Sequence, residues 1–259
     1  MTDSVAVVTG GASGIGRAFA ESMAEAGANV VIADIDETGA STVADELAAD
    51  TDAETLAIEV DVTDEAAVEA MIDETVDRFG RLDAAFANAG IAPAERGLEE
   101  YEMDQWDRVI GVNLRGAWLT DLYAARAMAE QDSGGSIINT ASVYGLSGLE
   151  TLAYSPAYAA SKGGVVNLTR TLGGEWGELG IRVNAIAPSH ARTEIGGGFF
   201  KEGFEGAEAL QQRVEDRTPL GRIPDPEELK GMALFLASDA SSYCTGYTYA
   251  VDGGWLASR

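Results

Sequence analysis

Short apolar runs alternate along the chain with longer segments whose apolar residues recur at helical spacing. The apolar runs predict buried strands at Val5–Thr9, Asn29–Ala33, Thr55–Val60, Leu82–Ala87, Ser136–Ala141, Ile181–Ala187 and Thr245–Val251. The helical spacing predicts helices at Ile15–Ala26, Glu37–Ala49, Asp64–Phe79, Met103–Ala129 and Pro156–Leu179. Regular alternation of strand and helix predicts a Rossmann-type α/β fold: a doubly wound parallel sheet with helices on both faces, as a single domain over residues 1–259.

Polar and glycine residues mark the ends of several predicted elements. Asp36 and Asp64 precede helices and are expected to cap them, and Gly80 is expected to close the second of these helices. The glycine-rich stretch 189–208 interrupts the alternation. Its place after a strand end predicts a mobile lid over the ligand site.

The first strand runs directly into a glycine turn, Gly10–Gly16, which includes Ser13, Gly14 and Ile15 and opens a helix. Backbone without side chains lets a pyrophosphate approach, and the free N–H groups of the helix start stabilise its charge. Asp34 ends the second predicted strand. A carboxylate there accepts hydrogen bonds from both adenosine ribose hydroxyls and repels a 2′-phosphate, so the sequence predicts NAD as the cofactor rather than NADP.

Acidic residues greatly outnumber basic ones, with 43 Asp and Glu against 17 Lys and Arg and a net charge of −26. This charge argues against nucleic acid or an anionic membrane as a partner. At molar salt the screening length falls to about 3 Å, which largely removes the self-repulsion. The composition therefore predicts a protein adapted to a salt-rich cytoplasm, as in halophilic organisms.

Other features of the composition exclude further classes of protein. The chain start has no signal-peptide pattern and no stretch is long and apolar enough to cross a bilayer, so a cytoplasmic location is expected. Cys244 is the only cysteine, which excludes an intrachain disulfide and a cysteine-cluster metal site. It is expected to be a small buried apolar residue.

Tyr158 and Lys162 lie one helical turn apart in a predicted helix, so their side chains share a face. A unit charge at about 4 Å, in an effective dielectric of about 20, is worth roughly 4 kcal/mol. The ammonium would then lower the pKa of the tyrosine by up to about three units. The pair is a candidate general base, although an isolated pair of this kind is usually a half-buried aromatic beside a surface charge.

Further motifs occur in register with this pair. They are Thr9-Gly10-x-x-x-Gly14-x-Gly16, Asp61, Asn88-Ala89-Gly90, Asn113, Ser142 and Tyr158-x-x-x-Lys162. In this order and spacing the sequence resembles the NAD(P)-dependent, single-domain short-chain dehydrogenases/reductases over nearly its whole length. The resemblance implies a dinucleotide-dependent oxidoreductase.

The resemblance implies a role for each member of a catalytic set. Tyr158 would exchange a proton with the substrate hydroxyl, while Lys162 would lower the tyrosine pKa and hold the nicotinamide ribose. Ser142 would donate a hydrogen bond to the substrate oxygen, and Asn113 would hold a water that passes protons from Lys162 toward solvent. From the residues alone, Ser142 could instead satisfy strand-end backbone and Asn113 could bond within its own turn.

The resemblance also assigns residues to the cofactor. It places Asp61 and Val62 at the adenine, Asn88 and Gly90 at the ribose region, and Thr193 on the nicotinamide side. Pro188 ends a strand at the same edge.

Three departures from the family pattern lie near the expected substrate. Ser189 replaces a frequent glycine, the interval from Ser142 to Tyr158 is longer than usual, and His190 and Arg192 follow Pro188. His190 is either a solvated loop residue or a substrate contact, and Arg192 would hold a carboxylate. Candidate substrate residues are Tyr144, Glu150, Tyr154, His190 and Arg192. This polar set favours a sugar, polyol or hydroxy/keto acid.

Two other functions are compatible with parts of the pattern. A 3-oxoacyl thioester reductase resembles the sequence almost as well, but Asp34 disfavours the NADPH that biosynthetic reduction draws on. A non-catalytic dinucleotide sensor would share the fold without needing the complete catalytic set. Apolar residues at Leu114, Trp118, Leu122, Trp255 and Leu256 suggest a homo-oligomer. The resemblance implies a homotetramer.

Overall fold

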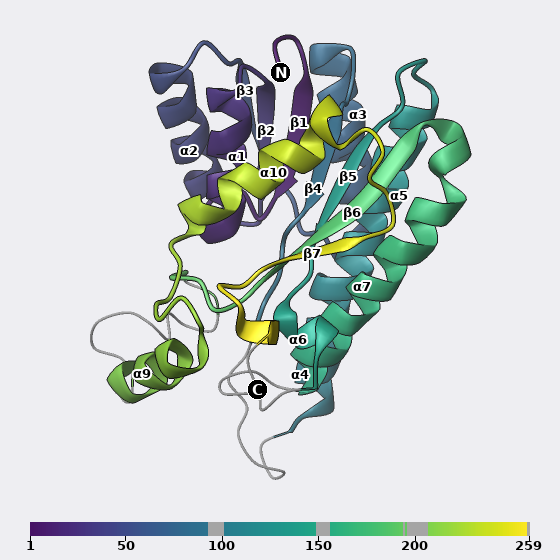
Figure 1. Cartoon of the computed structure of the whole chain (residues 1–259). Helices are drawn as coiled ribbons and strands as arrows, with labels where there is room; N and C mark the ends of the chain where they lie inside the picture. The colour runs from purple at the N-terminus through teal and green to yellow at the C-terminus, as the bar shows by residue number, and fades with distance from the viewer. Residues whose placement is uncertain (93–100, 149–155, 194, 196–206, 258–259) are drawn as a thin grey trace.

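A seven-stranded parallel sheet forms the centre of the molecule (Figure 1). The computed structural model describes residues 1–92, 101–148, 156–193, 195 and 207–257. The strands are β1 (Val5–Thr9), β2 (Asn29–Asp34), β3 (Thr55–Glu59), β4 (Ala84–Ala87), β5 (Gly135–Thr140), β6 (Ile181–Pro188) and β7 (Thr248–Val251). Their order is β3-β2-β1-β4-β5-β6-β7, with every neighbouring pair parallel. The predicted doubly wound fold is confirmed.

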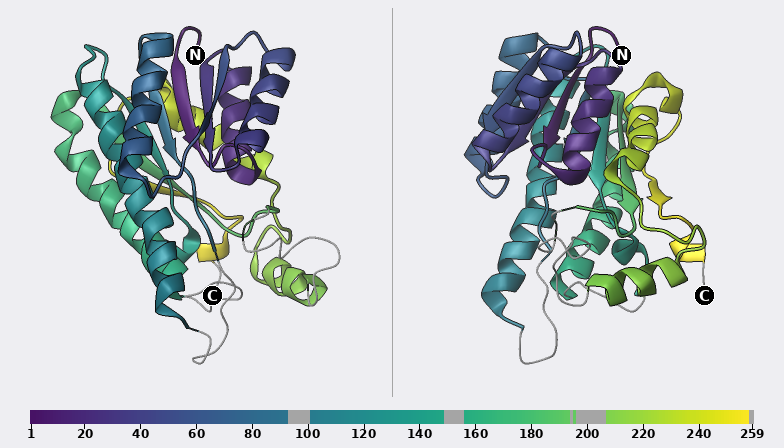
Figure 2. Two further views of the ribbon diagram at one scale, coloured as in Figure 1. Left: turned by 180° about the vertical axis from the view of Figure 1, so that it is seen from behind. Right: turned by 90° about the vertical axis from the view of Figure 1, so that its left-hand side faces the viewer.

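Helices cover both faces of the sheet. The helices are α1 (Gly14–Glu25), α2 (Glu37–Asp50), α3 (Glu65–Phe79), α4 (Met103–Ile110), α5 (Gly116–Ala129), α6 (Val143–Leu146), α7 (Pro156–Glu175), α9 (Ala207–Arg217) and α10 (Lys230–Ala237), with a π-helix η2 (Gly111–Arg115) and short 3-10 turns η3 (Gly177–Leu179), η4 (Pro226–Leu229), η5 (Asp239–Ser241) and η6 (Trp255–Ala257). Helices α1, α2 and α10 lie on one face, and α3, α5 and α7 on the other, as the view from behind in Figure 2 shows. Helix α9 lies apart from the sheet, beyond the carboxyl ends of the strands.

The predicted capping residues act as expected. The Asp36 carboxylate accepts a hydrogen bond from the Gly39 N–H, and Asp64 accepts one from the Ala66 N–H. Gly80 closes α3 in the left-handed conformation, with φ of 77°. Side-chain caps of this kind satisfy N–H groups that the first helical turn leaves free.

Two predicted helices differ from the structure, and the last strand is shorter than predicted. The helix predicted over Met103–Ala129 is divided by η2, whose wider turns rotate Asn113 away from the regular helical face. The helix beginning at Pro156 ends at Glu175 rather than Leu179. The segment 230–237, for which no helix was predicted, is α10. The spacing of apolar residues continues through the π-helix and past the end of α7, so it does not reveal either feature.

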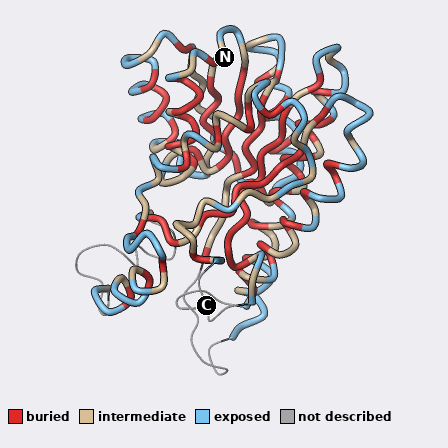
Figure 3. The backbone as a smooth tube through the Cα atoms, in the orientation of Figure 1, coloured by how far each residue is buried: buried red, intermediate tan, exposed pale blue. Residues whose placement is uncertain are grey.

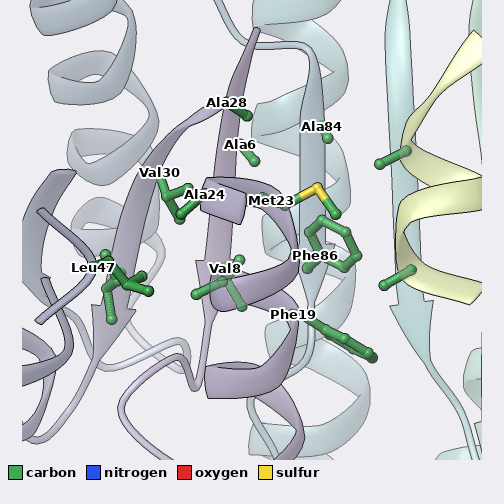
Figure 4. Packing of buried hydrophobic residues seen from close by; sticks show 14 of the residues in the cluster. Ala6, Val8, Phe19, Met23, Ala24, Ala28, Val30, Leu47, Ala84 and Phe86 are labelled. Carbon is green, nitrogen blue, oxygen red and sulfur yellow. The ribbon is translucent and has the colours of Figure 1, made fainter. Parts of the chain in front are cut away.

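Two apolar layers hold the sheet between its helices, and Figure 3 shows the buried backbone running along the strands. In the layer beneath α1, Met23, Phe19 and Phe86 are fully buried, and the two phenyl ring centroids are 5.2 Å apart (Figure 4).

No helix in the described part of the chain is both long and apolar enough to span a bilayer.

Two expectations about burial are wrong. Cys244 is a partly exposed free thiol rather than a core residue. Trp255, which suggested an intermolecular contact, is 1% exposed within its own chain and packs with Val143 and Tyr144 in an apolar cluster. Its burial depends on the position of α6, which sequence spacing does not show.

A buried carboxyl group lies between α5, β5 and α7. The side chain of Asp121 is fully buried, and the Asn139 amide donates to its Oδ2 at 3.0 Å. The same amide donates to the Thr169 hydroxyl oxygen at 3.1 Å. Burial raises the pKa of Asp121 to about 8, and the hydrogen bond from Asn139 opposes that rise. The folded protein therefore favours the neutral acid across the pH range where an exposed aspartate is ionised.

We expect replacement of Asp121 by asparagine to flatten the pH dependence of stability. The carboxyl has a pKa of about 8 in the folded state and an ordinary value of 3.8, so between these values the folded protein binds more protons than the unfolded chain. The free energy of unfolding of the natural protein should therefore fall as pH rises through this window, by at most about 1.4 kcal/mol per pH unit from this group.

Urea unfolding of the natural protein and of Asp121→Asn at several pH values measures this contribution. The stability of the variant relative to the natural protein should increase from pH 5 to pH 8. Asp73→Asn, at an exposed site on α3, makes the same change of charge without burial and should show no such trend. Parallel curves for the natural protein and Asp121→Asn would contradict a buried neutral acid.

Candidate active site

A cavity of about 950 Å³ lies at the carboxyl ends of the strands, on both sides of the point where the sheet order changes between β1 and β4. Parallel α/β sheets bind ligands at this place. The lining includes the predicted residues Gly10, Ser13, Gly14, Ile15, Gly16, Asp34, Asp61, Val62, Asn88, Gly90, Ser142, Tyr144, Tyr158, Lys162, Pro188 and Thr193. Residues far apart in sequence therefore meet in one cavity, as the strand-end pattern predicted.

The glycine turn forms a cradle that side chains would fill. Gly14 has a positive φ of 53°, and a Cβ added at Gly16 would lie 2.0 Å from the Gly10 carbonyl oxygen. The Asn88 amide donates to the carbonyl oxygens of Thr9 and Gly10, at 3.0 and 3.2 Å. Asn88 thus fixes the turn to the end of β4, and the start of α1 faces the cavity. This arrangement fits a pyrophosphate.

Asp34 is held in place at the end of β2. Its Oδ2 accepts from the Ala12 N–H at 3.0 Å, and its Oδ1 accepts from the Asp36 N–H at 3.1 Å. Each carboxylate oxygen can accept a further hydrogen bond, because an ionised carboxylate offers about four acceptor positions. The carboxylate lies on the cavity wall beside Ile35. The charge and the spare acceptors fit the two hydroxyls of an unphosphorylated ribose.

Asp61 and Val62 lie on the same wall, farther along the sheet. The Asp61 Oδ1 accepts hydrogen bonds from the Thr63 N–H at 2.9 Å and the Thr63 hydroxyl at 2.7 Å. This loop is therefore ordered by its own side chains, and the second carboxylate oxygen of Asp61 is not used in these bonds. The carboxylate oxygen of Asp61 fits the polar edge of an adenine ring, and the side chain of Val62 fits its face.

Asn113 lies behind the cavity wall and bonds outside its own turn, so the alternative of a bond within that turn is wrong, while the water expected beside it stays a prediction. Its Oδ1 accepts from the Ile91 N–H at 2.8 Å, and its Nδ2 donates to the Ile91 carbonyl oxygen at 2.9 Å and to the Ser161 hydroxyl oxygen at 3.2 Å. These bonds join η2 to the segment after β4 and to α7. Asn113 therefore fixes the backbone at Ile91 and contacts the residue that precedes Lys162.

Ser142, Tyr158 and Lys162 meet at the other end of the cavity. A side-chain hydrogen bond joins Tyr158 to Ser142. The Lys162 ammonium lies 5.8 Å from the centroid of the Tyr158 ring and donates to the Thr140 carbonyl oxygen at 2.7 Å. All three side chains are buried. Ser142 also accepts from the Tyr144 N–H at 3.2 Å, so it both caps α6 and contacts the tyrosine.

The expected lowering of the Tyr158 pKa is wrong for the protein without a bound cofactor. Burial raises the pKa of Tyr158 to about 12, and the hydrogen bond from Ser142 offsets part of the rise. Burial lowers the pKa of Lys162 to about 8. The helical spacing correctly brings the two side chains together, but both are removed from water, and desolvation disfavours the charged form of each.

The candidate substrate residues separate into four groups. Tyr144 lines the cavity. His190 is 1% exposed and does not line it, so it is neither solvated nor a direct substrate contact in this structure. Arg192 lies outside, on a second cavity beside α1, and pairs with Asp225 at 3.6 Å. Glu150 and Tyr154 lie outside the described residues.

Thr140 is a further site residue that belongs to none of the sequence motifs. Its carbonyl oxygen accepts from Lys162, and its hydroxyl donates to the Asn88 Oδ1 at 3.0 Å. Its position as the last residue of a strand next to Ser142 was the available signal. Ile91, which bonds Asn113, follows the motif Asn88-Ala89-Gly90 directly.

Comparison with known proteins agrees with this geometry. A family model described as Enoyl-(Acyl carrier protein) reductase matches residues 10–256. The chain is 43% identical to cis-4-hydroxycyclohexanecarboxylate dehydrogenase of Sinomonas cyclohexanicum over 98% of this chain and 96% of that protein.

Solved structures agree over the same length. A short-chain type dehydrogenase/reductase from Mycobacterium marinum superposes with a TM-score of 0.90 at 37% identity, covering 98% of this chain and 96% of that one. Levodione reductase superposes with a TM-score of 0.93 at 36% identity, covering 100% of both chains. This chain therefore belongs to the short-chain dehydrogenase/reductase family of oxidoreductases, whose members bind a nicotinamide dinucleotide.

Proposed function

We propose that the protein is an NAD-dependent dehydrogenase that interconverts a secondary alcohol and a ketone. The observation that carries this proposal is the convergence of Ser142 and Lys162 on Tyr158 in the same cavity as the glycine turn and Asp34. A phenol between a hydroxyl and an ammonium can move a proton at a substrate oxygen.

Each side chain has a defined task in this mechanism. In alcohol oxidation the Tyr158 phenolate takes the proton of the substrate hydroxyl, and in ketone reduction the phenol returns it. The Ser142 hydroxyl donates a hydrogen bond to the same substrate oxygen, whose charge changes most in the transition state. A bound oxidised nicotinamide would supply a positively charged ring able to accept the hydride from the substrate carbon. That positive charge also favours the phenolate form of Tyr158, which burial alone disfavours.

Lys162 and Asn113 complete the proton path in this proposal. The ammonium holds the nicotinamide ribose and exchanges a proton with a water beside the backbone that Asn113 fixes. The bonds from Asn113 to Ile91 and Ser161 support this, because they hold η2 against α7, which carries Lys162.

We expect NAD to be preferred over NADP. The carboxylate of Asp34 should make charge-assisted hydrogen bonds to the ribose, and these are worth about 1.5–3 kcal/mol, or roughly 10- to 100-fold in kcat/KM. Asp34→Ala should reduce the preference by a similar factor. Asp36→Ala removes a nearby charge that caps α2, and should leave the preference unchanged. A natural preference for NADP would refute the assignment.

The hydroxyl groups of Ser142, Tyr144 and Tyr158, all residues on the cavity wall, support a sugar, polyol or hydroxy/keto acid as the substrate. The name of the Sinomonas relative, which acts on a ring alcohol bearing a carboxylate, supports a hydroxy acid. The description of the matching family model, which names an acyl-carrier-protein reductase, favours as second candidate a 3-oxoacyl thioester reductase.

A panel of sugars, sugar acids, polyols and cyclic hydroxy acids tests the function, with NAD at molar KCl and reduced cofactor followed by absorbance. Turnover of a 3-oxoacyl thioester in preference to all of these would support the second candidate. Cofactor binding without turnover of any compound would leave a dinucleotide sensor as the function.

The proposal includes a homotetramer in a salt-rich cytoplasm. Most of the expected lid, residues 189–208, lies outside the described residues. The net charge of −26 supports the salt-rich setting. Trp118 on α5 and Trp176 after α7 stack with ring centroids 6.3 Å apart and remain partly exposed, which supports contact with a second copy. Light scattering on the same samples measures the assembly.

A further inference from the structure

Four ring contacts form a continuous row from α9 to the proposed catalytic tyrosine. The Arg217 guanidinium lies 4.4 Å from the Trp255 ring, and the Trp255 ring lies 4.8 Å from His190. His190 is 5.6 Å from the Tyr144 ring, and Tyr144 is 6.4 Å from Tyr158, measured between centroids and with the rings edge to face. Tyr144 and Tyr158 line the cavity, whereas Trp255 and His190 lie behind them.

A buried hydrogen bond lies at the centre of this row. The Tyr144 hydroxyl and the His190 Nε2 are 2.9 Å apart, and the two residues are 5% and 1% exposed. Burial, together with the positive charge of Arg217, lowers the pKa of His190 to about 4. The imidazole is therefore neutral at physiological pH, and it acts as a hydrogen-bond partner rather than as a charge.

The hydrogen bond fixes a very short helix. Tyr144 belongs to α6, which has a single turn, and its N–H donates to the Ser142 hydroxyl oxygen at 3.2 Å. The backbone of Tyr144 thus contacts Ser142, its ring contacts Tyr158, and its hydroxyl is anchored on the segment after β6. Because Tyr144 is held at its backbone N–H and at its hydroxyl, its ring is restricted to one position on the cavity wall.

We propose that His190 is a positioning residue, whose hydrogen bond to the Tyr144 hydroxyl holds the Tyr144 ring against Tyr158 as the wall that orients the substrate. This inference rests on the proposed dehydrogenase function. In this proposal His190 does not touch the substrate, and its imidazole acts on the substrate only through Tyr144. Loss of this hydrogen bond should change kcat/KM for the substrate and not the Kd for NAD. Among the described contacts, neither His190 nor Tyr144 touches the glycine turn or Asp34.

Kinetics of four variants test the proposal with a substrate found in the panel. His190→Leu should lower kcat/KM for the substrate roughly five- to tenfold, the range of one buried neutral hydrogen bond, and leave the Kd for NAD unchanged. Tyr144→Phe should have the same effect, because it removes the other partner. The double variant should lose no more than either single variant, because all three remove one interaction. His190→Gln, whose amide reaches a similar position, should restore most of the activity that His190→Leu loses.

Additive losses in the double variant would overturn the proposal, as would full activity of Tyr144→Phe. Equal loss in His190→Gln and His190→Leu would also overturn it, since it would show that only the shape of the imidazole matters. Thermal unfolding of each variant separates a loss of folding from a loss of positioning.

A measurement without turnover keeps this test separate from the proposed function. His190 is the only histidine in the chain, so histidine labelled with nitrogen-15 gives one imidazole in the NMR spectrum. Its Nε2 signal should shift in Tyr144→Phe and should not titrate between pH 5 and pH 8. An unchanged Nε2 signal, or a titration near pH 6.5, would overturn the hydrogen bond. A protein inactive on every compound would count against the dehydrogenase function alone.

Discussion

Tyr158→Phe should lower kcat for alcohol oxidation about a thousandfold and leave the Kd for NAD within about twofold of the natural value. General acid–base catalysis contributes about 10²- to 10⁴-fold, and phenylalanine removes only the group that exchanges the proton. The ring remains, so its edge-to-face contact with Tyr144 and the packing of α7 are kept. Steady-state kinetics and a cofactor titration measure the two quantities.

The pH dependence of the natural protein gives the second half of this prediction. Alcohol oxidation needs the phenolate, so kcat/KM should rise with pH toward the alkaline pKa of Tyr158, which burial raises to about 12 in the free protein. Ketone reduction needs the phenol, so it should stay level below this pKa and fall only as the pH passes it. Tyr123→Phe removes a hydroxyl outside the cavity, where it bonds Glu65, and serves as the control. Residual activity of Tyr158→Phe near the natural level would exclude Tyr158 as the base.

Lys162→Arg should lower kcat about a hundredfold or more, although it keeps the positive charge. The ammonium is 3% exposed and lies 2.7 Å from the Thr140 carbonyl oxygen, and a Cβ at Gly90 would lie only 3.5 Å from it. A planar guanidinium is larger and has its donors in a fixed fork, so it cannot occupy this space in the same way. The Kd for NAD should rise as well, because the same ammonium is proposed to hold the ribose.

Lys230→Arg provides a matched control for this substitution. Lys230 lies on α10 and forms ion pairs with Glu21 and Glu25, each at 2.9 Å, where arginine can replace it. Its activity should equal that of the natural protein. If Lys162→Arg also kept full activity, any cation at this position would suffice, and the proposed proton exchange through a lysine would be wrong.

The scarcity of lysine in the sequence bears on the same residue. Lysine occurs only at Lys162, Lys201 and Lys230, and arginine supplies the other basic residues. One of these few lysines, Lys162, is buried beside the proposed catalytic tyrosine, where burial lowers its pKa to about 8. A group that can lose its proton near neutral pH suits proton exchange, which arginine cannot perform.

Much of the fold could be predicted because buried parallel strands and amphipathic helices leave strong periodic patterns. The strands were located to within a few residues, with β7 the least accurate, and the caps at Asp36 and Asp64 were identified by residue type. The π-helix at Asn113 was not found, since one extra residue per turn alters hydrogen bonding without altering composition. The burial of Asp121 was not predicted for a related reason: its place between α5 and β5 depends on a contact with Asn139, which is distant in sequence.

By itself the sequence determined many of the residues that line the cavity, because a parallel sheet brings the ends of its strands to one edge whatever the details of packing. The glycine turn, Asp34, Ser142 and the pair Tyr158 and Lys162 all follow from that rule and from helical spacing. Only the tertiary structure decided the charge state of these groups, since desolvation depends on everything packed around them. It raised the pKa of Tyr158, where spacing alone predicted a fall.

The tertiary structure also decided the roles of the two residues after Pro188. His190 turns inward to Tyr144, whereas Arg192 turns outward to Asp225. Side-chain direction in a loop depends on distant partners, and these partners lie on α6 and just before η4. Local sequence carries information about spacing along one element, but not about which element another part of the chain places opposite it.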